Sequence, residues 1–335
     1  MNKLLKTILT ASFIVALTVV IFSKSISAQS TNLNAAQGIQ ISPALVELNA
    51  VRNKTYTVNL SILNVTAYDL DYNVSVENFS AADETGSPRI LVDDNLPNSI
   101  SIKNWVSSIP DFQLNARQST KVTFNITIPD NAEAGGHYGV LKFSGIAPEI
   151  ESTGVGLSAS AGVLILVRVD GDIEEEANLA SFYASSNGKQ SILFESSPIT
   201  FVTRIKNIGN VHIKPVGNIE LRDTFGNLIN TISINENKSN VLPDSIRRFE
   251  SEHKKGWMFG LYSASLTLGY GTTGQAITQT IHFWVIPYKL ILSIIFIVAT
   301  VLFILSKILK MYNRRIIEKL KNEEAKNKKK NNKRK

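Results

Sequence analysis

Residues 55–62 read TYTVNLSI, and polar and apolar side chains alternate along this stretch as they do in a β-strand with one buried face. The same alternation recurs in residues 71–77 (DYNVSVE), 121–128 (KVTFNITI) and 201–205 (FVTRI). Turn-forming residues separate these runs at short intervals, and no amphipathic helix of substantial length precedes residue 285. The pattern predicts an all-β fold class in which short strands form sandwiches.

Two halves of this β-rich region repeat one order of features. In the first half a strand runs into Asn64, and a later strand that opens with glycine contains Tyr138; Asn207 and Tyr262 hold the corresponding places in the second half. The repeated order predicts two tandem immunoglobulin-like β-sandwich domains. The interval from asparagine to tyrosine is 74 residues in the first half and 55 in the second, which predicts an extra loop around residues 81–110.

The first predicted domain spans residues 38–172, and the second spans residues 178–284. The first opens with residues 39–48 (IQISPALVEL), in which Pro43 indicates an edge position or a bulge because proline cannot donate a backbone hydrogen bond. It closes with residues 161–169 (AGVLILVRV), which are nearly all apolar. Such a run predicts a strand that is buried on both faces.

The N-terminus has the pattern of a signal peptide over residues 1–28. Lys3 and Lys6 provide a positive start, residues 7–22 carry no charge, and small residues lead to a cleavage site after Ala28. An uncleaved N-terminal anchor is the alternative, although the apolar run is short for a full membrane span. Both interpretations place the following segment outside the cytoplasm.

A second apolar segment near the C-terminus predicts one transmembrane α-helix over residues 285–309. Residues 290–305 carry no charge and are mostly Ile, Leu, Val and Phe, and the extended segment is long enough for the hydrocarbon layer, which needs about 20 residues. Aromatic and lysine side chains flank it where they anchor a helix at the two interfaces. These predicted interface anchors are Trp284, Tyr288, Lys289, Lys307 and Lys310.

Charge predicts the orientation of this helix. The formal net charge of the chain is +7, of which residues 307–335 contribute +10 and the signal region +3, which leaves −6 for residues 29–306. The excess of Lys and Arg predicts that residues 310–335 form a basic cytoplasmic tail and that the acidic body is extracellular. The expected location is the cell membrane, crossed once. Because the basic run adjoins a membrane helix, membrane lipid is its expected partner and nucleic acid is not.

The residue content argues against enzymatic chemistry. The chain has no cysteine, which excludes disulfides, thiolate metal sites and cysteine nucleophiles. The four histidines show no metal-ligand spacing, and nucleophile elbows and phosphate-binding glycine loops are absent. The acidic groups Asp93–Asp94 and Glu174–Glu176 lack the pattern of a calcium loop, and the second is expected to be an interdomain linker. We therefore expect no enzyme, no cofactor and no metal.

The extra loop of the first domain offers apolar side chains for binding. Trp105, Ile109 and Phe112 are the candidate partner-binding residues. The alternative is that the same three side chains cover the sandwich of their own domain.

In architecture and in local sequence the chain resembles the WxL-interacting proteins of bacterial cell surfaces. Residues 41–48 (ISPALVEL) look like the opening of that family. Residues 119–129 (STKVTFNITIP), followed by AGGHY at 134–138, are similar to its Thr-x-x-Val-Thr-Phe…Pro…Gly-Gly-x-Tyr region, and residues 162–169 resemble its closing apolar strand. The second half of the chain matches only loosely.

This resemblance implies a scaffold that is anchored in the membrane and holds cell-surface or cell-wall-associated partner proteins through its β-sandwich domains. Addition of a partner strand to a free sheet edge is a physically reasonable mode of binding. The alternative function is a membrane-tethered assembly chaperone for secreted or pilin-like subunits. Such a protein would be similar to the periplasmic pilus chaperones, which also use two immunoglobulin-like domains.

Overall fold

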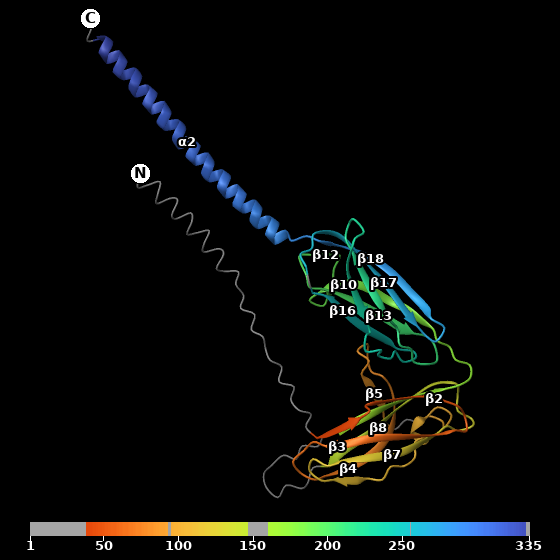
Figure 1. The fold of residues 1–335 in the computed structure, drawn as a ribbon. Coiled ribbons are helices and arrows are strands. Elements are labelled where there is room, and N and C mark those ends of the chain that lie inside the picture. Colours follow the sequence, from red (N-terminus) through yellow and green to blue (C-terminus); the bar gives the residue numbers. More distant parts are fainter. Residues whose placement is uncertain (1–37, 93–94, 147–159, 255, 333–335) are drawn as a thin grey trace.

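The computed structural model describes residues 38–92, 95–146, 160–254 and 256–332. The predicted signal peptide with its cleavage site at Ala28, and the acidic pair at 93–94, lie outside the described residues. Figure 1 shows two β-rich units in succession along the chain, followed by a long helix that projects away from the second unit. The prediction of a mostly β fold with a C-terminal apolar helix is confirmed at this level.

The N-terminal unit, residues 38–169, contains two sheets. One has the strand order β1-β3-β7, and the other has the order β2-β9-β8-β4-β5, with β6 also paired to β4. The strands are β1 (Ile39–Ser42), β2 (Leu45–Ala50), β3 (Thr55–Asn64), β4 (Leu70–Ala81), β5 (Pro88–Leu91), β6 (Phe112–Leu114), β7 (Ser119–Thr127), β8 (Gly135–Ile146) and β9 (Ser160–Val169), with the short 3₁₀ helix η1 (Ile102–Asn104) between β5 and β6.

The C-terminal unit, residues 177–285, also contains two sheets. Their strand orders are β11-β10-β13-β16 and β12-β18-β17-β14-β15. The strands are β10 (Ala177–Ser186), β11 (Lys189–Gln190), β12 (Leu193–Phe194), β13 (Ile199–Asn207), β14 (Val216–Arg222), β15 (Leu228–Ile234), β16 (Ile246–His253), β17 (Gly260–Tyr270) and β18 (Gln275–Val285).

The two units start in the same way. In the N-terminal unit the chain pairs antiparallel with β3 through β1 and then moves to the other sheet, where β2 pairs parallel with β9. In the C-terminal unit β10 pairs antiparallel with β13, and β12 then pairs parallel with β18. Residues 39–48 are therefore two strands in two sheets, and Pro43 lies at the change of sheet, where no ladder hydrogen bond is required of it.

Each unit has its own hydrophobic core. The core of the N-terminal unit draws large side chains from both of its sheets, such as Phe124 from β7 and Phe143 from β8. Phe201 and Phe283 do the same in the C-terminal unit, where their ring centroids lie 5.8 Å apart. The alternating residues predicted from the sequence supply these contacts, since successive side chains of a strand point to opposite faces.

Strand β9 is buried on both faces, as its composition predicts. Val163, Ile165 and Val167 point into the core of the N-terminal unit. Leu166, on the opposite face, belongs to a small apolar cluster that also contains Leu242 of the C-terminal unit. The second face is buried because the C-terminal unit covers it.

The C-terminal helix α2 extends from Tyr288 to Asn332, so it covers most of the predicted span of 285–309 and continues through the segment predicted to be the basic tail. Pro287 directly precedes the helix, and no glycine or proline occurs within it. Its basic half is rich in Lys, Glu and Arg, which favour helix, so nothing in the sequence ends the helix where the apolar run stops. Among the described residues, α2 is the helix that is long and apolar enough to cross a membrane.

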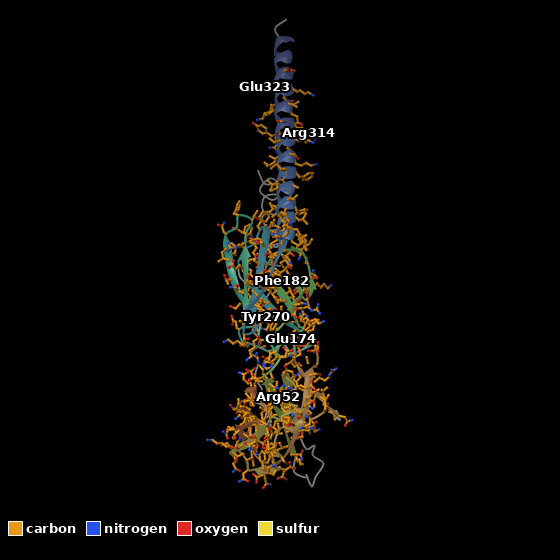
Figure 2. The ribbon with its side chains drawn as sticks, turned by 90° about the vertical axis from the view of Figure 1, so that its right-hand side faces the viewer. Arg52, Glu174, Phe182, Tyr270, Arg314 and Glu323 are labelled. Atoms are coloured by element: carbon orange, nitrogen blue, oxygen red, sulfur yellow. The ribbon has the colours of Figure 1, made fainter. Side chains whose placement is uncertain are left out.

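Figure 2 shows the molecule as an elongated body, with the N-terminal unit, the C-terminal unit and α2 in line. The labelled side chains of Arg52, Glu174, Tyr270 and Arg314 follow one another along its length. The junction of the two units therefore lies at the far end of the C-terminal unit from α2.

Candidate functional site

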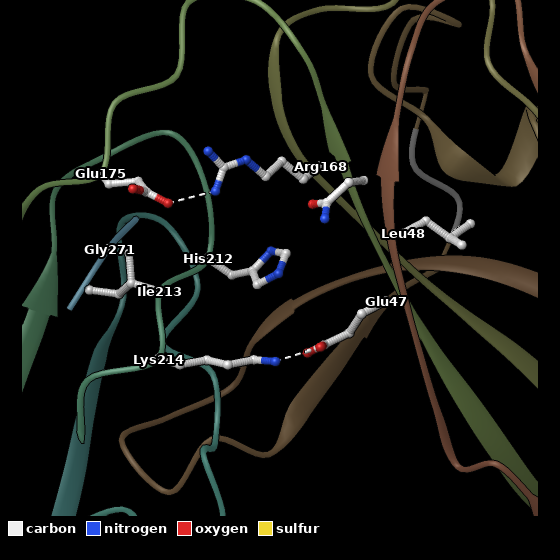
Figure 3. A pocket seen from close by; sticks show the side chains of 9 residues that line it. Glu47, Leu48, Arg168, Glu175, His212, Ile213, Lys214 and Gly271 are labelled. Atoms are coloured by element: carbon white, nitrogen blue, oxygen red, sulfur yellow. Dashed lines mark hydrogen bonds and ion pairs between the residues drawn. The ribbon is translucent and has the colours of Figure 1, made fainter. Parts of the chain in front are cut away.

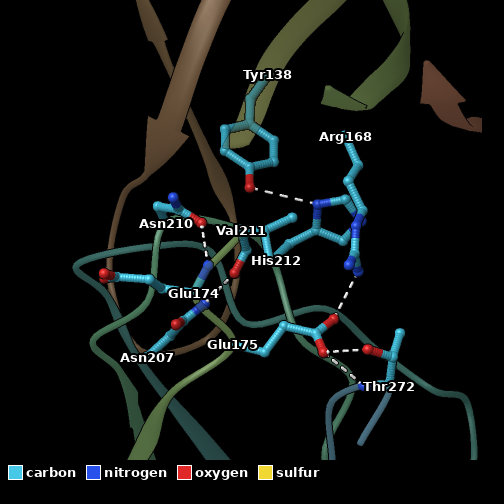
Figure 4. Close-up of polar contacts among 9 residues, drawn as sticks. All are labelled: Tyr138, Arg168, Glu174, Glu175, Asn207, Asn210, Val211, His212 and Thr272. Carbon is cyan, nitrogen blue, oxygen red and sulfur yellow. Dashed lines mark hydrogen bonds and ion pairs between the residues drawn. The ribbon is translucent and has the colours of Figure 1, made fainter. Parts of the chain in front are cut away.

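The linker between the units, residues 170–176, is fixed by hydrogen bonds from a turn of the C-terminal unit. Asn210 bonds to the linker through three groups: its backbone N–H donates to the carbonyl of Glu174, its amide donates to Asp172, and its side-chain oxygen accepts from the N–H of Glu174, at 2.8–3.0 Å. Its own carbonyl accepts a bond of 2.8 Å from the N–H of Gly136 in β8. The side chain and backbone of Asn210 thus connect the linker with both units (Figure 4).

Glu175 of the linker also joins the two units. Its carboxylate pairs with Arg168 of β9 at 2.5 Å and accepts two bonds of 2.6 Å from the N–H and hydroxyl of Thr272. Burial disfavours the charge of Glu175, but the bonds from Thr272 and Arg168 outweigh it and lower the pKa of this carboxyl. The acidic run that the sequence analysis assigned to a linker therefore contains a structural carboxylate.

A second ion pair crosses the junction from β2. The carboxylate of Glu47 lies 2.5 Å from the ammonium of Lys214 and accepts a bond of 2.8 Å from the amide of Asn240 (Figure 3). Partial burial opposes ionisation of Glu47, but the hydrogen bonds from Lys214 and Asn240 lower its pKa nonetheless. A cavity of ≈ 380 Å³ lies between this pair and the pair of Arg168 with Glu175.

His212 lies at this cavity beside Tyr138. The tyrosine hydroxyl is 3.3 Å from Nδ1 of His212, and the two rings meet edge to face at 5.7 Å (Figure 4). Burial lowers the pKa of His212 to about 4 and raises the pKa of Tyr138 well above its ordinary value. Both side chains are therefore neutral near pH 7, and neither is poised to transfer a proton.

The opposite side of the junction combines an ion pair with apolar packing. Glu84 pairs through both carboxylate oxygens with Arg204 of β13, and its backbone carbonyl accepts from the N–H of Arg248 at 2.8 Å. Nearby, Leu242 packs on Phe79 and its neighbours in the outer face of β4, β8 and β9. The ion pairs of Glu47, Glu84 and Glu175 each connect the two units, so they hold the units in position at the junction.

A separate groove lies in the C-terminal unit between the edge strands β15 and β16. Each stands at the end of its own sheet, and residues of both strands line a groove of ≈ 540 Å³. The lining includes Glu236, Glu250, Glu252 and serine and threonine side chains. Glu250 pairs with Arg248 at 2.5 Å and Glu252 with Lys254 at 3.4 Å, and the hydroxyl of Ser251 donates a bond of 3.2 Å to the carbonyl of Ser233 across the groove. A groove between two sheet edges suits an extended segment.

The predicted membrane anchors lie at the transition from β18 to α2 and along α2. Trp284 and Tyr288 are about half exposed, and Lys289 pairs with Glu195 at 2.6 Å. Lys307 lies over the ring of Phe303 at 5.4 Å, and Lys310 is exposed on the helix surface.

The three candidate partner-binding residues pack on the N-terminal unit. Trp105 is 3% exposed, and its indole N–H donates a bond of 2.7 Å to the carbonyl of Asn98. Ile109 packs against the same core, and Phe112 stacks on Tyr72 at 5.6 Å. These contacts agree with the alternative expectation that the extra loop covers its own sandwich. That loop also contains β5 and η1.

Two of the four histidines are buried on strands. His137 on β8 is buried, with its two ring nitrogens 2.9 Å from the carbonyls of Ile100 and Glu133. His253 on β16 is buried as well, and its Nδ1 lies 3.1 Å from the amide of Asn230. Within the described ranges, no group of three or more His, Asp or Glu is arranged to hold a metal ion.

Sequence reasoning missed the residues of the junction and of the groove. Lys214, Arg204 and Asn240 belong to no motif, and their partners Glu47 and Glu84 lie more than 100 positions away in the sequence. The acidic run at 174–176 was the one local signal, since charged residues between two β-rich regions indicate a linker.

The chain was compared with known proteins at the levels of sequence and structure. No protein-family model and no curated protein matches it. In structure it is similar to the class 5 fimbriae chaperone CfaA, at 14% identity and a TM-score of 0.38, over 72% of this chain and 98% of that chain. It is also similar to the E. coli chaperone DraB, at 13% identity and a TM-score of 0.32, over 73% of this chain and 96% of that one. A third similar chain comes from the complex of SafA pilin with the SafB chaperone of Salmonella enterica. Its sequence identity is 12% and its TM-score is 0.32, over 74% of this chain and 96% of that chain.

Proposed function

We propose that this chain is a membrane-anchored binding protein without enzymatic activity, and that its exported β-units hold another polypeptide. The apolar half of α2 supports the anchor, because none of the residues in its most apolar stretch is buried and its large apolar side chains are exposed along its length. The basic half supports a cytoplasmic C-terminus, with lysines placed to meet anionic headgroups.

The observation that carries this proposal is the groove between β15 and β16. A strand at the end of a sheet presents backbone N–H and C=O groups to which an extended segment can bind. Side chains that line the groove then select the segment, and here Glu236 favours one with Lys or Arg, as do Glu250 and Glu252 when they exchange Arg248 and Lys254 for basic groups of the partner. The groove belongs to the unit that is joined directly to α2, so a bound partner is held close to the membrane.

The junction supports a binding role in a second way. Ion pairs and apolar contacts fix the two units relative to each other, so little orientational freedom is lost when a partner contacts both. A scaffold that presents two surfaces benefits from such preorganisation.

For the N-terminal unit we propose kinship with the WxL-interacting proteins, and for both units an immunoglobulin-like arrangement. The change of sheet by the first strand in both units supports the second of these proposals. The partner is then a cell-surface or cell-wall-associated protein.

The alternative is an assembly chaperone for secreted or pilin-like subunits, tethered to the membrane. CfaA, DraB and SafB are themselves described as chaperones, and SafB is in complex with a pilin. The two versions differ in the lifetime of the complex, because a scaffold keeps its partner whereas a chaperone releases it.

Photo-crosslinking on intact cells tests the proposal and separates the versions. A photoreactive amino acid at Thr231 on β15 should capture an exported polypeptide with a basic segment, and the double variant Glu250→Lys/Glu252→Lys should reduce capture. The same group at Thr278, exposed on the face of β18, is the matched control. A pulse-chase then shows a stable partner for a scaffold and only newly exported subunits for a chaperone. Equal capture from Thr231 and Thr278 would show that the groove is not the binding site.

A further inference from the structure

The end of the C-terminal unit next to α2 exposes an unusual set of large apolar side chains. Three of them are more exposed than buried by a wide margin, and three are about half exposed. They are Phe225 (89% exposed), Trp257 (77%), Ile192 (72%), Phe259 (54%), Leu193 (52%) and Trp284 (48%). We call this set the apolar rim.

Strand register places the members of the rim at one end of the unit. Leu193 pairs with Trp284, and Gly260, next to Phe259, pairs with Val285 at the end of β18. The turn that carries Phe225 reaches the same end, because the hydroxyl of Thr224 donates a bond of 2.7 Å to the carbonyl of Leu261. Figure 1 shows α2 leaving the C-terminal unit from the end at which β12 lies.

The loop that carries Trp257 and Phe259 holds the two rings in a defined arrangement. Their centroids are 5.9 Å apart and their planes are nearly parallel, at 14°. The backbone N–H of Phe259 donates a bond of 3.2 Å to the hydroxyl of Tyr262, which is itself buried. The rings therefore form an ordered, solvent-exposed pair.

The opposite end of the same unit has a different composition. Two of its turns read NENKSN at residues 235–240 and GTTG at residues 271–274, with no large apolar side chain. An aromatic cluster at one end only is unlike the scattered apolar residues of an ordinary protein surface, and it indicates an interaction site.

The connection to α2 limits how far the rim can lie from the bilayer. The apolar run starts at Leu290, six residues after Trp284, and even a fully extended chain of that length spans at most about 21 Å. Two further contacts keep the unit close to the helix: Lys289 pairs with Glu195 at 2.6 Å, and the N–H of Ile286 donates to the carbonyl of Phe194 at 2.8 Å.

We propose that the apolar rim inserts into the headgroup layer of the same bilayer that α2 spans, so that the C-terminal unit rests on the membrane surface. Tryptophan and phenylalanine are suited to this layer, because their large rings leave water while the indole N–H keeps a polar partner. The inference rests on the proposed membrane anchor. The rim gives the C-terminal unit a second contact with the membrane, made by loops that precede α2. With two contacts the unit has a defined orientation on the bilayer, and so has the groove between β15 and β16.

Single cysteines test this proposal cleanly, because the natural chain has none. The full-length protein is prepared with one cysteine in place of Trp257, Phe225, Thr273 or Val298, and each is labelled with an environment-sensitive fluorophore. The proteins are reconstituted into vesicles of phosphatidylcholine and phosphatidylglycerol that carry spin-labelled lipids, either near the headgroup or near the bilayer centre. Thr273, exposed at the opposite end of the unit, is the matched control, and Val298 in α2 reports on the anchor.

We expect headgroup spin labels to quench the fluorophore at positions 257 and 225 at least about twofold more than at 273, since interfacial residues lie about 5–10 Å into the boundary layer. Quenching at 298 by the deep spin label with no excess at 257 and 225 would overturn the rim proposal and leave the anchor intact. Absence of quenching at 298 would overturn the anchor itself. Disulfide cross-linking between copies through position 257, without lipid quenching there, would show that the rim binds a second copy and would also overturn the proposal.

Discussion

Asn207 makes in the C-terminal unit the same hydrogen bonds that Asn64 makes in the N-terminal unit. Asn64 is the last residue of β3 and Asn207 the last residue of β13, and both are fully buried. The amide of Asn64 donates to the carbonyls of Tyr68 and Leu114 at 2.9 and 3.1 Å, and its oxygen accepts from the N–H of Thr66 at 3.0 Å.

The amide of Asn207 likewise donates to the carbonyls of Val211 and Val241, both at 2.8 Å, and its oxygen accepts from the N–H of Gly209 at 3.0 Å. In both units one accepting carbonyl (Tyr68 or Val211) lies four residues after the asparagine, and the donating N–H (Thr66 or Gly209) lies two residues after it. The repeated asparagine of the sequence is therefore a turn anchor in each unit.

Replacement of either asparagine should destabilise its unit. In Asn207→Ala the buried carbonyls of Val211 and Val241 lose their donor, and an unsatisfied buried polar group costs about 1–3 kcal/mol. We expect a loss of about 2–4 kcal/mol in the free energy of unfolding, measured by urea denaturation of the full chain in detergent. Asn64→Ala should behave similarly. Asn59→Ala, on the exposed face of β3, is the control and should change the free energy by about 0.5 kcal/mol or less. Equal effects at positions 59 and 207 would contradict the role of the turn anchor.

Acidification should weaken the junction through His212. Its pKa is near 6.5 in the unfolded chain and about 4 in the folded protein, so below pH 6.5 the unfolded state binds more protons and stability falls with pH. A difference of this size corresponds to about 3 kcal/mol, lost progressively between pH 6.5 and 4. The carboxylates of Glu47, Glu84 and Glu175 have lowered pKa values, so their contribution is present above pH 4.5 and is lost only at lower pH.

Thermal unfolding of the full chain from pH 7 to 5 checks this expectation. In the variant His212→Asn the melting temperature should change less over that range than in the natural protein, because the titrating group is gone. The same pH dependence in both proteins would assign it to another group.

The carboxylates of Glu47, Glu84 and Glu175 should keep the two units in one orientation. Spin labels on single cysteines at Thr57 and Thr278, one in each unit, should give a narrow distance distribution by pulsed electron paramagnetic resonance. The triple variant Glu47→Ala/Glu84→Ala/Glu175→Ala should broaden it, because each carboxylate joins the units at a different point. Glu220→Ala, which breaks the exposed pair with Arg222 within the C-terminal unit, should leave the distribution unchanged. A narrow distribution in the triple variant would show that apolar packing alone fixes the junction.

The proposed orientation in the membrane makes a further prediction for intact cells. A membrane-impermeant thiol reagent should label a cysteine at Thr57 directly, whereas a cysteine at Lys321, in the basic half of α2, should react only after permeabilisation. The reason is the excess of Lys and Arg after the apolar run, which is retained in the cytoplasm. Labelling of position 321 on sealed cells would reverse the orientation.

Local patterns in the sequence were sufficient to predict the long alternating strands and the apolar helix of this protein. The alternation in residues 55–62 and 121–128 predicted β3 and β7, because a period of two reflects burial of one face and needs no knowledge of the partner strand. The apolar run at 290–305 predicted α2 for a similar reason, since length and composition alone determine whether a helix suits a bilayer. Hydrophobicity does not indicate that α2 continues through the basic segment to Asn332, because a helix exposed to water needs no apolar side chains.

The tertiary structure decided how distant residues meet. Residues 39–48 alternate like one strand, and only the two sheets show that the chain changes sheet at Pro43. The pairs of Glu47 with Lys214 and of Glu84 with Arg204 join residues more than 100 positions apart, and a single charged residue carries no local sign of its partner.

The tertiary structure also decided which aromatic side chains are buried and which are exposed. Trp105 and Trp257 are both tryptophans in loops, yet the first is buried against the core of the N-terminal unit and the second is exposed at the end of the C-terminal unit next to α2. By itself the sequence determined the strands, the apolar helix and the charge of each segment, because these depend on neighbouring residues. The packing of the two units determined which side chains face the junction, the groove and the apolar rim, because burial depends on segments that are brought together only by folding.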